Sequence, residues 1–579
     1  MKKAFLLIRL LCILFPAALA AQAPENTPCE NPDAQINLEG NGLLARILSA
    51  GDFGWDLSGE AVYWPNFDIN NPGPPVATIF LGGLWYGGLD PVGNLKLKAT
   101  TYRSGGKTSF YAGPLDPATG TTNPSDCHKW DRFFEVSSTA VNDFLADLAD
   151  GSLSGTHHSV RGWPGRGNPF FSDVWGYDLP FTSQPLAPFH DEDGDGLYNP
   201  MAGDYPVVKL QGLEEFVPDQ QIWLVTNDQG GGGVDSVTGG LPLQAEIQIT
   251  YFVFNCPDNP LLNNAMFTSH KLIHYGSEPV DSFSLAMYVD FDLGCYTDDY
   301  LGCHPATNTF YTYNRTNNDQ SISACGLANA FGLNPPVQAV TFLNKSLDRF
   351  MPIYNTGTGN PPAATTHPQS PVEYFNYLHG HWRNGLPLTY GLSGYTTNST
   401  ATPTTHAFPG NPNIASEWSM KSTNQPGRDQ RGLAIHEVGT LVPGQILELN
   451  TAWSYHRGDS LDYLGNVNLM LGEVPHLLDL YAGNFAGVCA PFVSAKSPAS
   501  ASAMRIWPNP ASTAFYVHLP DASSGIAKVF NQTGILMAAQ PFEGTELLAF
   551  DCGTWPKGIY FLQISDGKSV LSRSIAVTR

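Results

Sequence analysis

Apolar and polar residues alternate with the period of a β-strand along much of this chain. Residues 95–100, with the sequence LKLKAT, place every second side chain on one face. Between residues 221 and 290, four largely apolar stretches are separated by clusters of Gly, Pro and Asn; they cover residues 221–226, 245–255, 265–274 and 282–289. Further strands are expected at 433–438 and 446–455. This regular spacing is typical of an antiparallel β-sandwich.

Two stretches have the periodicity of a helix instead. Val141, Phe144, Leu145 and Leu148 follow i, i+3, i+4 and i+7 spacing, and Gly151 marks the end of that helix. Residues 461–481 predict a second helix, which we expect to close the body of the protein.

Composition supports a β-rich fold. Gly and Pro are abundant, at 58 and 46 residues, whereas charged residues make up 14% of the chain, against about 25% in an average protein. Many turns and few charged helices favour strands. We therefore predict an all-β protein with minor helices.

The length of 579 residues predicts several domains. We expect an N-terminal β-rich region at 21–212, a sandwich domain closed by the helix at 213–493, a small-residue linker at 494–504 and a small immunoglobulin-like sandwich at 505–579. The body is either one large sandwich or two that meet near Gly212.

Residues 1–20 have the order of an export signal: basic residues, a short apolar run and a small-residue cleavage site. The run is shorter than the roughly 20 residues that span a bilayer, and no later stretch is long and apolar enough, so we predict no transmembrane segment. The net charge of −23 repels phosphate backbones, which argues against nucleic acid as a partner.

An acidic segment, HDEDGDGLYNPMAGD at 190–204, resembles a calcium loop. Calcium prefers six to eight oxygen ligands, and acids at positions 1, 3 and 5 before a glycine allow the chain to wrap one ion. The expected ligands are Asp191, Asp193, Asp195, the Leu197 carbonyl, Asn199 and Asp204. The segment departs from an EF-hand at position 12, where Ala202 replaces the usual Glu. The alternative is an acidic turn held by its own hydrogen bonds.

A second acidic cluster contains Asp290, Asp292, Asp298 and Asp299. Four carboxylates close together raise each other's pKa unless a cation lies between them, so a second calcium site and a solvated loop are both considered. Cys295 and Cys303 bracket this turn. Since an exported chain permits disulfides, they are a candidate pair.

The C-terminal segment carries an ordered set of motifs: Trp507-Pro508-Asn509-Pro510, a turn that ends at Gly534, and a strand that contains Pro556, Gly558 and Tyr560. In this order the segment resembles the type A sorting domain of the type IX secretion system of Bacteroidetes. The resemblance implies export across the outer membrane, interaction with the secretion machinery and its sortase, and attachment to surface lipopolysaccharide or release.

The body resembles a group of uncharacterised proteins that carry this sorting domain. The resemblance rests on LGGLWYGGLD, the DEDGDGLYNPMAGDYP loop, VDFDLGCYTDDYLGC and YFNYLHGHWRNGLPLTYG. It implies localisation outside the cell or on its outer surface, but it identifies no active site. We therefore predict a non-catalytic, calcium-stabilised protein with a structural, adhesive or glycan-contacting role. The alternative is an extracellular hydrolase of polysaccharide or protein.

Overall fold

A computed structural model describes residues 28–67, 75–152, 157–180, 186–320, 325, 330–356, 360–489, 505–518, 524–531, 535–543, 547–565 and 570–578. The chain forms two compact units, Met1–Ala490 and Pro491–Arg579. The predicted signal peptide (1–20), the predicted linker (494–504) and Gly534 lie outside the described residues.

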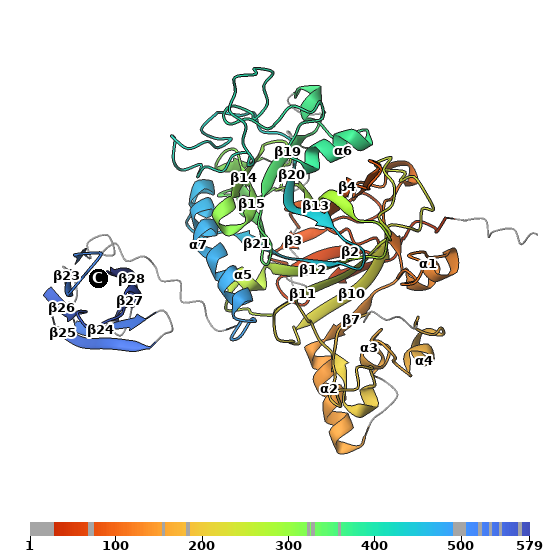
Figure 1. Ribbon diagram of the computed structural model, residues 1–579, viewed down its shortest axis with the longest axis horizontal. Coiled ribbons are helices and arrows are strands. Elements are labelled where there is room, and N and C mark those ends of the chain that lie inside the picture. The colour runs from red at the N-terminus through yellow and green to blue at the C-terminus, as the bar shows by residue number, and fades with distance from the viewer. Residues whose placement is uncertain are drawn as a thin grey trace, which may run out of the picture. The chain divides into compact units, whose positions relative to one another are not determined.

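The larger sheet of the body has nine antiparallel strands (Figure 1). Its order is β14-β15-β18-β21-β12-β11-β10-β6, and β7 also pairs with β10. The strands are β6 (Tyr111–Ala112), β7 (Phe134–Ser137), β10 (Gln220–Asn227), β11 (Ala245–Val253), β12 (Ala265–His274), β14 (Asp299–His304), β15 (Thr309–Asn314), β18 (Val337–Phe342) and β21 (Ile446–His456).

The smaller sheet has the order β19-β20-β13-β4-β5. Its strands are β4 (Ile79–Leu89), β5 (Leu95–Ala99), β13 (Val280–Phe291), β19 (Arg349–Tyr354) and β20 (Gln430–Leu441). A three-stranded sheet, β1 (Gln35–Leu38), β2 (Leu43–Leu48) and β3 (Tyr63–Pro65), continues it through bridges at Phe53. A Cβ on Gly82 would lie 2.4 Å from the Phe53 ring, so glycine permits this close approach.

The two sheets of the body share one hydrophobic core. Phe53, beside the smaller sheet, packs edge-on against Trp453 of β21 with ring centroids 4.7 Å apart. The predicted division near Gly212 is therefore wrong, because β6 and β7 precede Gly212 and yet pair with β10, which follows it. Long-range strand pairing joins the two halves into a single unit.

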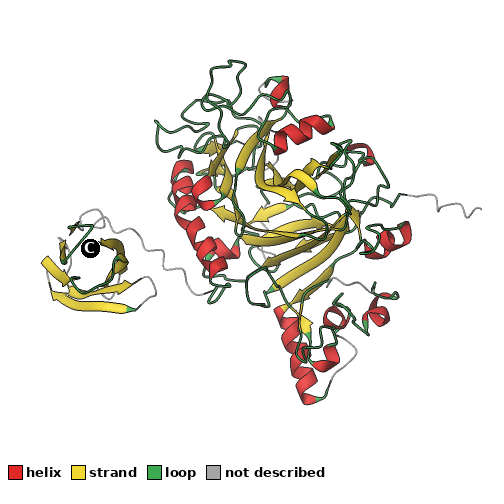
Figure 2. Cartoon of the chain, viewed as in Figure 1, coloured by secondary structure: helices red, strands yellow, loops and turns green. Residues whose placement is uncertain are grey.

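Helices lie around the sheets (Figure 2). They are α1 (Pro124–Trp130), α2 (Ser138–Asp150), α3 (His158–Arg161), α4 (Phe171–Trp175), α5 (Pro260–Asn263), α6 (Pro371–Leu378) and α7 (Tyr463–Ala482). Short 3-10 turns cover Ser104–Gly106, Pro200–Ala202, Pro305–Thr307 and Ala363–Thr365. The two predicted helices correspond to α2 and α7, and α7 packs on β15, β18 and β21.

The C-terminal unit consists of two small antiparallel sheets around one core. One contains β22 (Arg505–Trp507), β23 (Ala514–His518) and β26 (Leu547–Asp551); the other contains β24 (Ser524–Asn531), β25 (Leu536–Glu543), β27 (Gly558–Ser565) and β28 (Val570–Val577). Strands make up 37% of the structure and helices 15%, which confirms an all-β protein with minor helices.

Candidate functional site

The acidic loop brings three of its predicted ligands together. Asp191, Asp193 and Asp195 each offer a carboxylate oxygen, and these three oxygens lie within 4.8 Å of one another. The loop connects the short strands β8 (Phe189–His190) and β9 (Tyr205–Pro206). Tyr198 anchors it, since its ring is buried and its hydroxyl donates to the Val160 carbonyl at 2.7 Å.

Hydrogen bonds within the loop shape the acidic turn. The two oxygens of Asp191 accept from the backbone N–H groups of Gly194 and Gly196, at 2.8 and 2.9 Å. Asp195 accepts from the Leu197 N–H at 2.7 Å. Both glycines have positive φ angles, of 74° and 75°, which wrap the chain around the carboxylates. Hard oxygen donors in this arrangement suit calcium.

The side chains of the two other predicted ligands, Asp204 and Asn199, accept hydrogen bonds from backbone N–H groups. Asp204 is fully buried and accepts from the N–H groups of Glu192 and Asn199, at 2.9 and 2.7 Å. Burial raises its pKa; those two hydrogen bonds lower it, and the charges of Asp191 and Asp193 raise it. The Asn199 side chain accepts from the Met201 N–H at 3.1 Å. Asp204 therefore closes the loop beside the three clustered acids.

The second predicted cluster divides into two groups. Asp290 and Asp292 lie with Asp429, whereas Asp298 lies with Cys295 and Asp319. The reason is topological, because β13 belongs to the smaller sheet and β14 to the larger one, so the turn between them crosses from sheet to sheet. Asp299 is buried and accepts from the Leu293 N–H at 3.0 Å. The four acids do not converge on one point.

Arg431 pairs with two of the three acids in the first of these groups. Its Nε lies 2.9 Å from Asp290 Oδ1, and its Nη1 lies 2.7 Å from Asp429 Oδ1. The Tyr102 hydroxyl donates to Asp290 Oδ2 at 2.6 Å. Burial raises the pKa of Asp290 to about 6, although the Arg431 charge opposes the rise. For Asp292, burial raises the pKa well above its ordinary range, and the charges of Asp290 and Asp429 add to the rise.

Sequence reasoning missed Arg431, Asp429 and Tyr102. The only local signal for Asp429 and Arg431 is the presence of charged residues at the start of an apolar strand. Their partner Asp290 lies more than a hundred residues away along the chain from Arg431 and from Tyr102, so no local pattern reveals the contact. Arg431 supplies one positive charge here, and it joins Asp290 and Asp429 in a buried ion-pair network.

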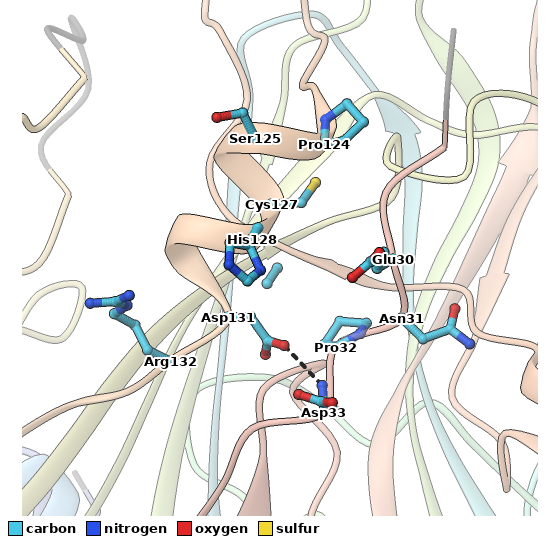
Figure 3. A pocket seen from close by; sticks show the side chains of 11 residues that line it. Glu30, Asn31, Pro32, Asp33, Pro124, Ser125, Cys127, His128, Asp131 and Arg132 are labelled. Carbon is cyan, nitrogen blue, oxygen red and sulfur yellow. Dashed lines mark hydrogen bonds between the residues drawn. The ribbon is translucent and has the colours of Figure 1, made fainter. Parts of the chain in front are cut away.

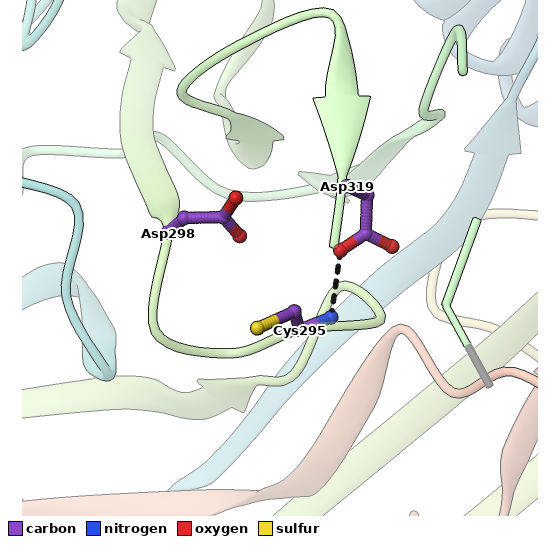
Figure 4. A group of neighbouring side chains, drawn as sticks. All are labelled: Cys295, Asp298 and Asp319. Carbon is purple, nitrogen blue, oxygen red and sulfur yellow. Dashed lines mark hydrogen bonds between the residues drawn. The ribbon is translucent and has the colours of Figure 1, made fainter. Parts of the chain in front are cut away.

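The second group is shown in Figure 4, where the Asp319 carboxylate accepts from the Cys295 N–H at 2.9 Å. Burial and the neighbouring Asp319 raise the pKa of Asp298 to about 7. The predicted disulfide between Cys295 and Cys303 is not formed, and both thiols are free and buried. Cys303 instead belongs to the core that the two sheets share, and its thiol donates to the Ala407 carbonyl at 3.2 Å.

Two cavities flank α1. One, of about 640 Å³, is lined by Glu30, Asp33, His128, Asp131 and Arg132 beside the Cys29–Cys127 disulfide (Figure 3). The Asp131 carboxylate accepts from the Asp33 N–H at 3.0 Å, so it holds the cavity wall in place.

The other cavity, of about 510 Å³, lies on the opposite side of α1. Its polar lining includes Asp116, Asn123, Asp126, Lys129 and Asp178, together with the half-buried ring of Tyr177. Carboxylates, amides and an aromatic ring form a lining that can hydrogen-bond a polar ligand.

The motif residues of the C-terminal unit tie its strands together. Asn509 accepts from the Ala576 N–H at 2.9 Å, which links the opening motif to β28. The Tyr560 hydroxyl donates to the Pro556 carbonyl at 2.8 Å, and Gly558 begins β27. Trp507, just before Pro508 and Pro510, remains 43% exposed and packs near Tyr516, with ring centroids 6.2 Å apart.

These contacts make the C-terminal unit a compact β module with its own core. Residues 505–578 match the family model of the secretion system C-terminal sorting domain, so the chain carries a sorting domain of the type IX secretion system. The sorting domain indicates interaction with that machinery and export to the cell surface or the extracellular space. Among the described residues, no helix is both long and apolar enough to cross a membrane.

No match was found among curated proteins. Among solved structures, the chain is similar to a polysaccharide lyase at 10% identity; the match covers 64% of this chain and 38% of that chain, with a TM-score of 0.19.

Proposed function

We propose that this is an exported, calcium-stabilised protein that acts at the cell surface or outside the cell by contact and not by catalysis. The observation that carries the proposal is the sorting domain at residues 505–578. Residues 1–20 act as the signal peptide for passage into the periplasm, and the type IX machinery and its sortase complete export. The body then performs a structural, adhesive or glycan-contacting role, and surface lipopolysaccharide is one candidate attachment point.

Calcium at the acidic loop is the second part of the proposal. Asp191, Asp193 and Asp195 hold three carboxylate oxygens within 4.8 Å of one another, and like charges at this separation repel unless a cation compensates them. Asp204, Asn199 and the Leu197 carbonyl are the additional oxygen donors of the predicted set. A bound ion stabilises the folded body because the unfolded chain does not present this arrangement.

The arrangement of carboxylates favours a binding or structural role over a hydrolase activity. A glycoside hydrolase uses two carboxyl groups that face its substrate. The strongly perturbed acids Asp290 and Asp292 lie instead beside Arg431, and Asp290 is buried. The cavity lined by Asp126, Tyr177 and Asp178 is the better candidate for a polar ligand such as a sugar.

The experiment compares binding with turnover for the secreted protein purified from the culture medium. We expect it to bind immobilised surface polysaccharide or lipopolysaccharide and to release neither reducing ends nor peptides. Asp178→Ala, in the cavity, should weaken binding several-fold, whereas Asp173→Ala, which changes another exposed acid in α4 outside that lining, should not. Release of sugar or peptide products would establish the hydrolase alternative.

A further inference from the structure

The cysteines of the body have different environments. Cys29 is joined to Cys127, and Cys256 to Cys489. Among the described residues of that unit, the remaining cysteines are Cys295, Cys303 and Cys325, and all three are buried. Cys303 lies within β14 and contributes to the core, with its thiol donating to the Ala407 carbonyl at 3.2 Å. Two buried thiols, those of Cys295 and Cys325, are therefore left in the turn region between the sheets.

Cys295 and Cys325 are neighbours in space. The Asp319 carboxylate accepts from the Cys295 N–H at 2.9 Å, and the Cys325 thiol donates to the Gln320 carbonyl at 3.3 Å. The same short segment thus holds both cysteines. The Cys295 thiol lies 3.2 Å from the Thr297 hydroxyl, and the Cys325 side chain is among the groups that raise the pKa of Cys295. Cys295 lies in the turn between β13 and β14, and Asp319 and Gln320, which hold the two cysteines, lie at the end of β16 (Asn318–Asp319).

We propose that Cys295 and Cys325 form a third disulfide of the exported protein. The two thiols lose two protons and two electrons as one S–S bond forms. The electrons reduce the disulfide of a periplasmic thiol–disulfide oxidoreductase to two thiols, a class of oxidant that export through the periplasm provides. The bond closes a loop of about 30 residues and fixes the turn that carries Asp298 against the segment that carries Asp319.

The surroundings of the pair determine when the bond forms. Disulfide exchange proceeds through the thiolate, and burial, together with the Cys325 side chain, raises the pKa of Cys295 to about 12. Cys295 is 0% exposed in the folded protein, so an oxidoreductase cannot reach it there. Oxidation therefore takes place before the turn packs, during folding in the periplasm.

The test is peptide mapping without reduction of the full secreted chain, with free thiols alkylated during denaturation. We expect one peptide pair that joins Cys295 to Cys325, while Cys303 is alkylated. Cys295→Ser should convert Cys325 from unmodified to fully alkylated, and Cys325→Ser should do the same to Cys295. Both single variants should lower the Tm by a few degrees, and the double variant should lower it no further.

Cys303→Ser is the matched control, because it removes a buried thiol of the same region and should leave the Cys295–Cys325 peptide pair intact. Three results would overturn the proposal. Alkylation of both cysteines in the wild type would show a reduced pair, and a Cys295–Cys303 peptide would show different connectivity. Stoichiometric zinc that is lost in Cys295→Ser, with both thiols alkylated after chelation, would show a metal centre with Asp298 and Asp319.

Discussion

Asp290 and Arg431 lie directly opposite each other on β13 and β20, with Arg431 Nε 2.9 Å from Asp290 Oδ1. Their side chains are only 3% and 10% exposed. Burial of two charges costs several kcal/mol per ion, and the attraction between them offsets that cost only while both are present. The pair therefore fixes the alignment of the two strands more than it adds net stability.

Removal of the Arg431 guanidinium should strongly destabilise the folded protein. Arg431→Met leaves Asp290 and Asp429 buried without their counterion, so we expect a loss of about 3–5 kcal/mol in the free energy of unfolding. Denaturant titration measures it. The matched control is Arg349→Met, which breaks the more exposed Arg349–Glu437 pair at β19 and β20 and should cost at most about 1 kcal/mol. Equal losses in the two variants would contradict a buried network.

Asp298 should make the stability of the body depend on pH. Burial, followed by the charge of Asp319, raises its pKa to about 7 in the folded protein, above the ordinary value of about 4 in the unfolded chain. The contribution of Asp298 to stability is therefore fully present below pH ~4 and is lost as the pH rises through about 7. Asp298→Asn should thus raise the Tm at pH 8 relative to wild type, with a much smaller effect at pH 4.

Thermal melts of both proteins between pH 4 and pH 8 provide the measurement. Asp178→Asn is the control, because that side chain is exposed and lies in another part of the body. A Tm difference between Asp298→Asn and wild type that stays constant over this range would show that the Asp298 carboxylate does not titrate there.

Local patterns predict local features of this protein well. Helix α2 follows from the spacing of Val141 and Phe144 and from Gly151, whose φ of 74° ends the helix. The clustering of Asp191, Asp193 and Asp195 follows from alternate acids around glycines. These features depend on residues within one or two turns of chain.

Tertiary pairing is not encoded in such patterns. Arg431 reaches Asp290 across 141 positions, and Cys256 reaches Cys489 across 233. Proximity in sequence favoured the Cys295–Cys303 pair, but the β13–β14 turn passes between sheets and directs the two side chains to different surroundings. Strands on the two sides of Gly212 also pair with each other, so the two domains expected from the sequence form one body.

Calcium should stabilise the body through the acidic loop. At a calcium concentration of about 100 times the Kd, linkage predicts a gain of roughly 2.7 kcal/mol, visible as a higher Tm. Asp193→Ala combined with Asp195→Ala should abolish the shift. Asp90→Ala is the control, because Asp90 also accepts backbone hydrogen bonds within a turn but belongs to no carboxylate cluster found in the described structure. Equal calcium shifts in the wild type and the double variant would refute the assignment.

Deletion of residues 505–579 should retain the protein in the periplasm. The body is a compact unit with its own core, and the sorting unit has a separate core, so the deletion should leave the body folded. Cell fractionation and protease shaving of intact cells should then find the truncated chain inside the outer membrane and the full chain outside it.

A milder variant separates the role of the sorting domain from the effects of truncation. Asn509→Ala removes the hydrogen bond to the Ala576 N–H, which connects the opening motif to the last strand. Loss of a side-chain hydrogen bond of this kind costs on the order of 1 kcal/mol, so export should decrease in proportion to the unfolded fraction of the sorting unit and should not cease. If the chain without residues 505–579 reached the cell surface at the wild-type level, the terminal unit would not be the export signal, and delivery would have to depend on the body.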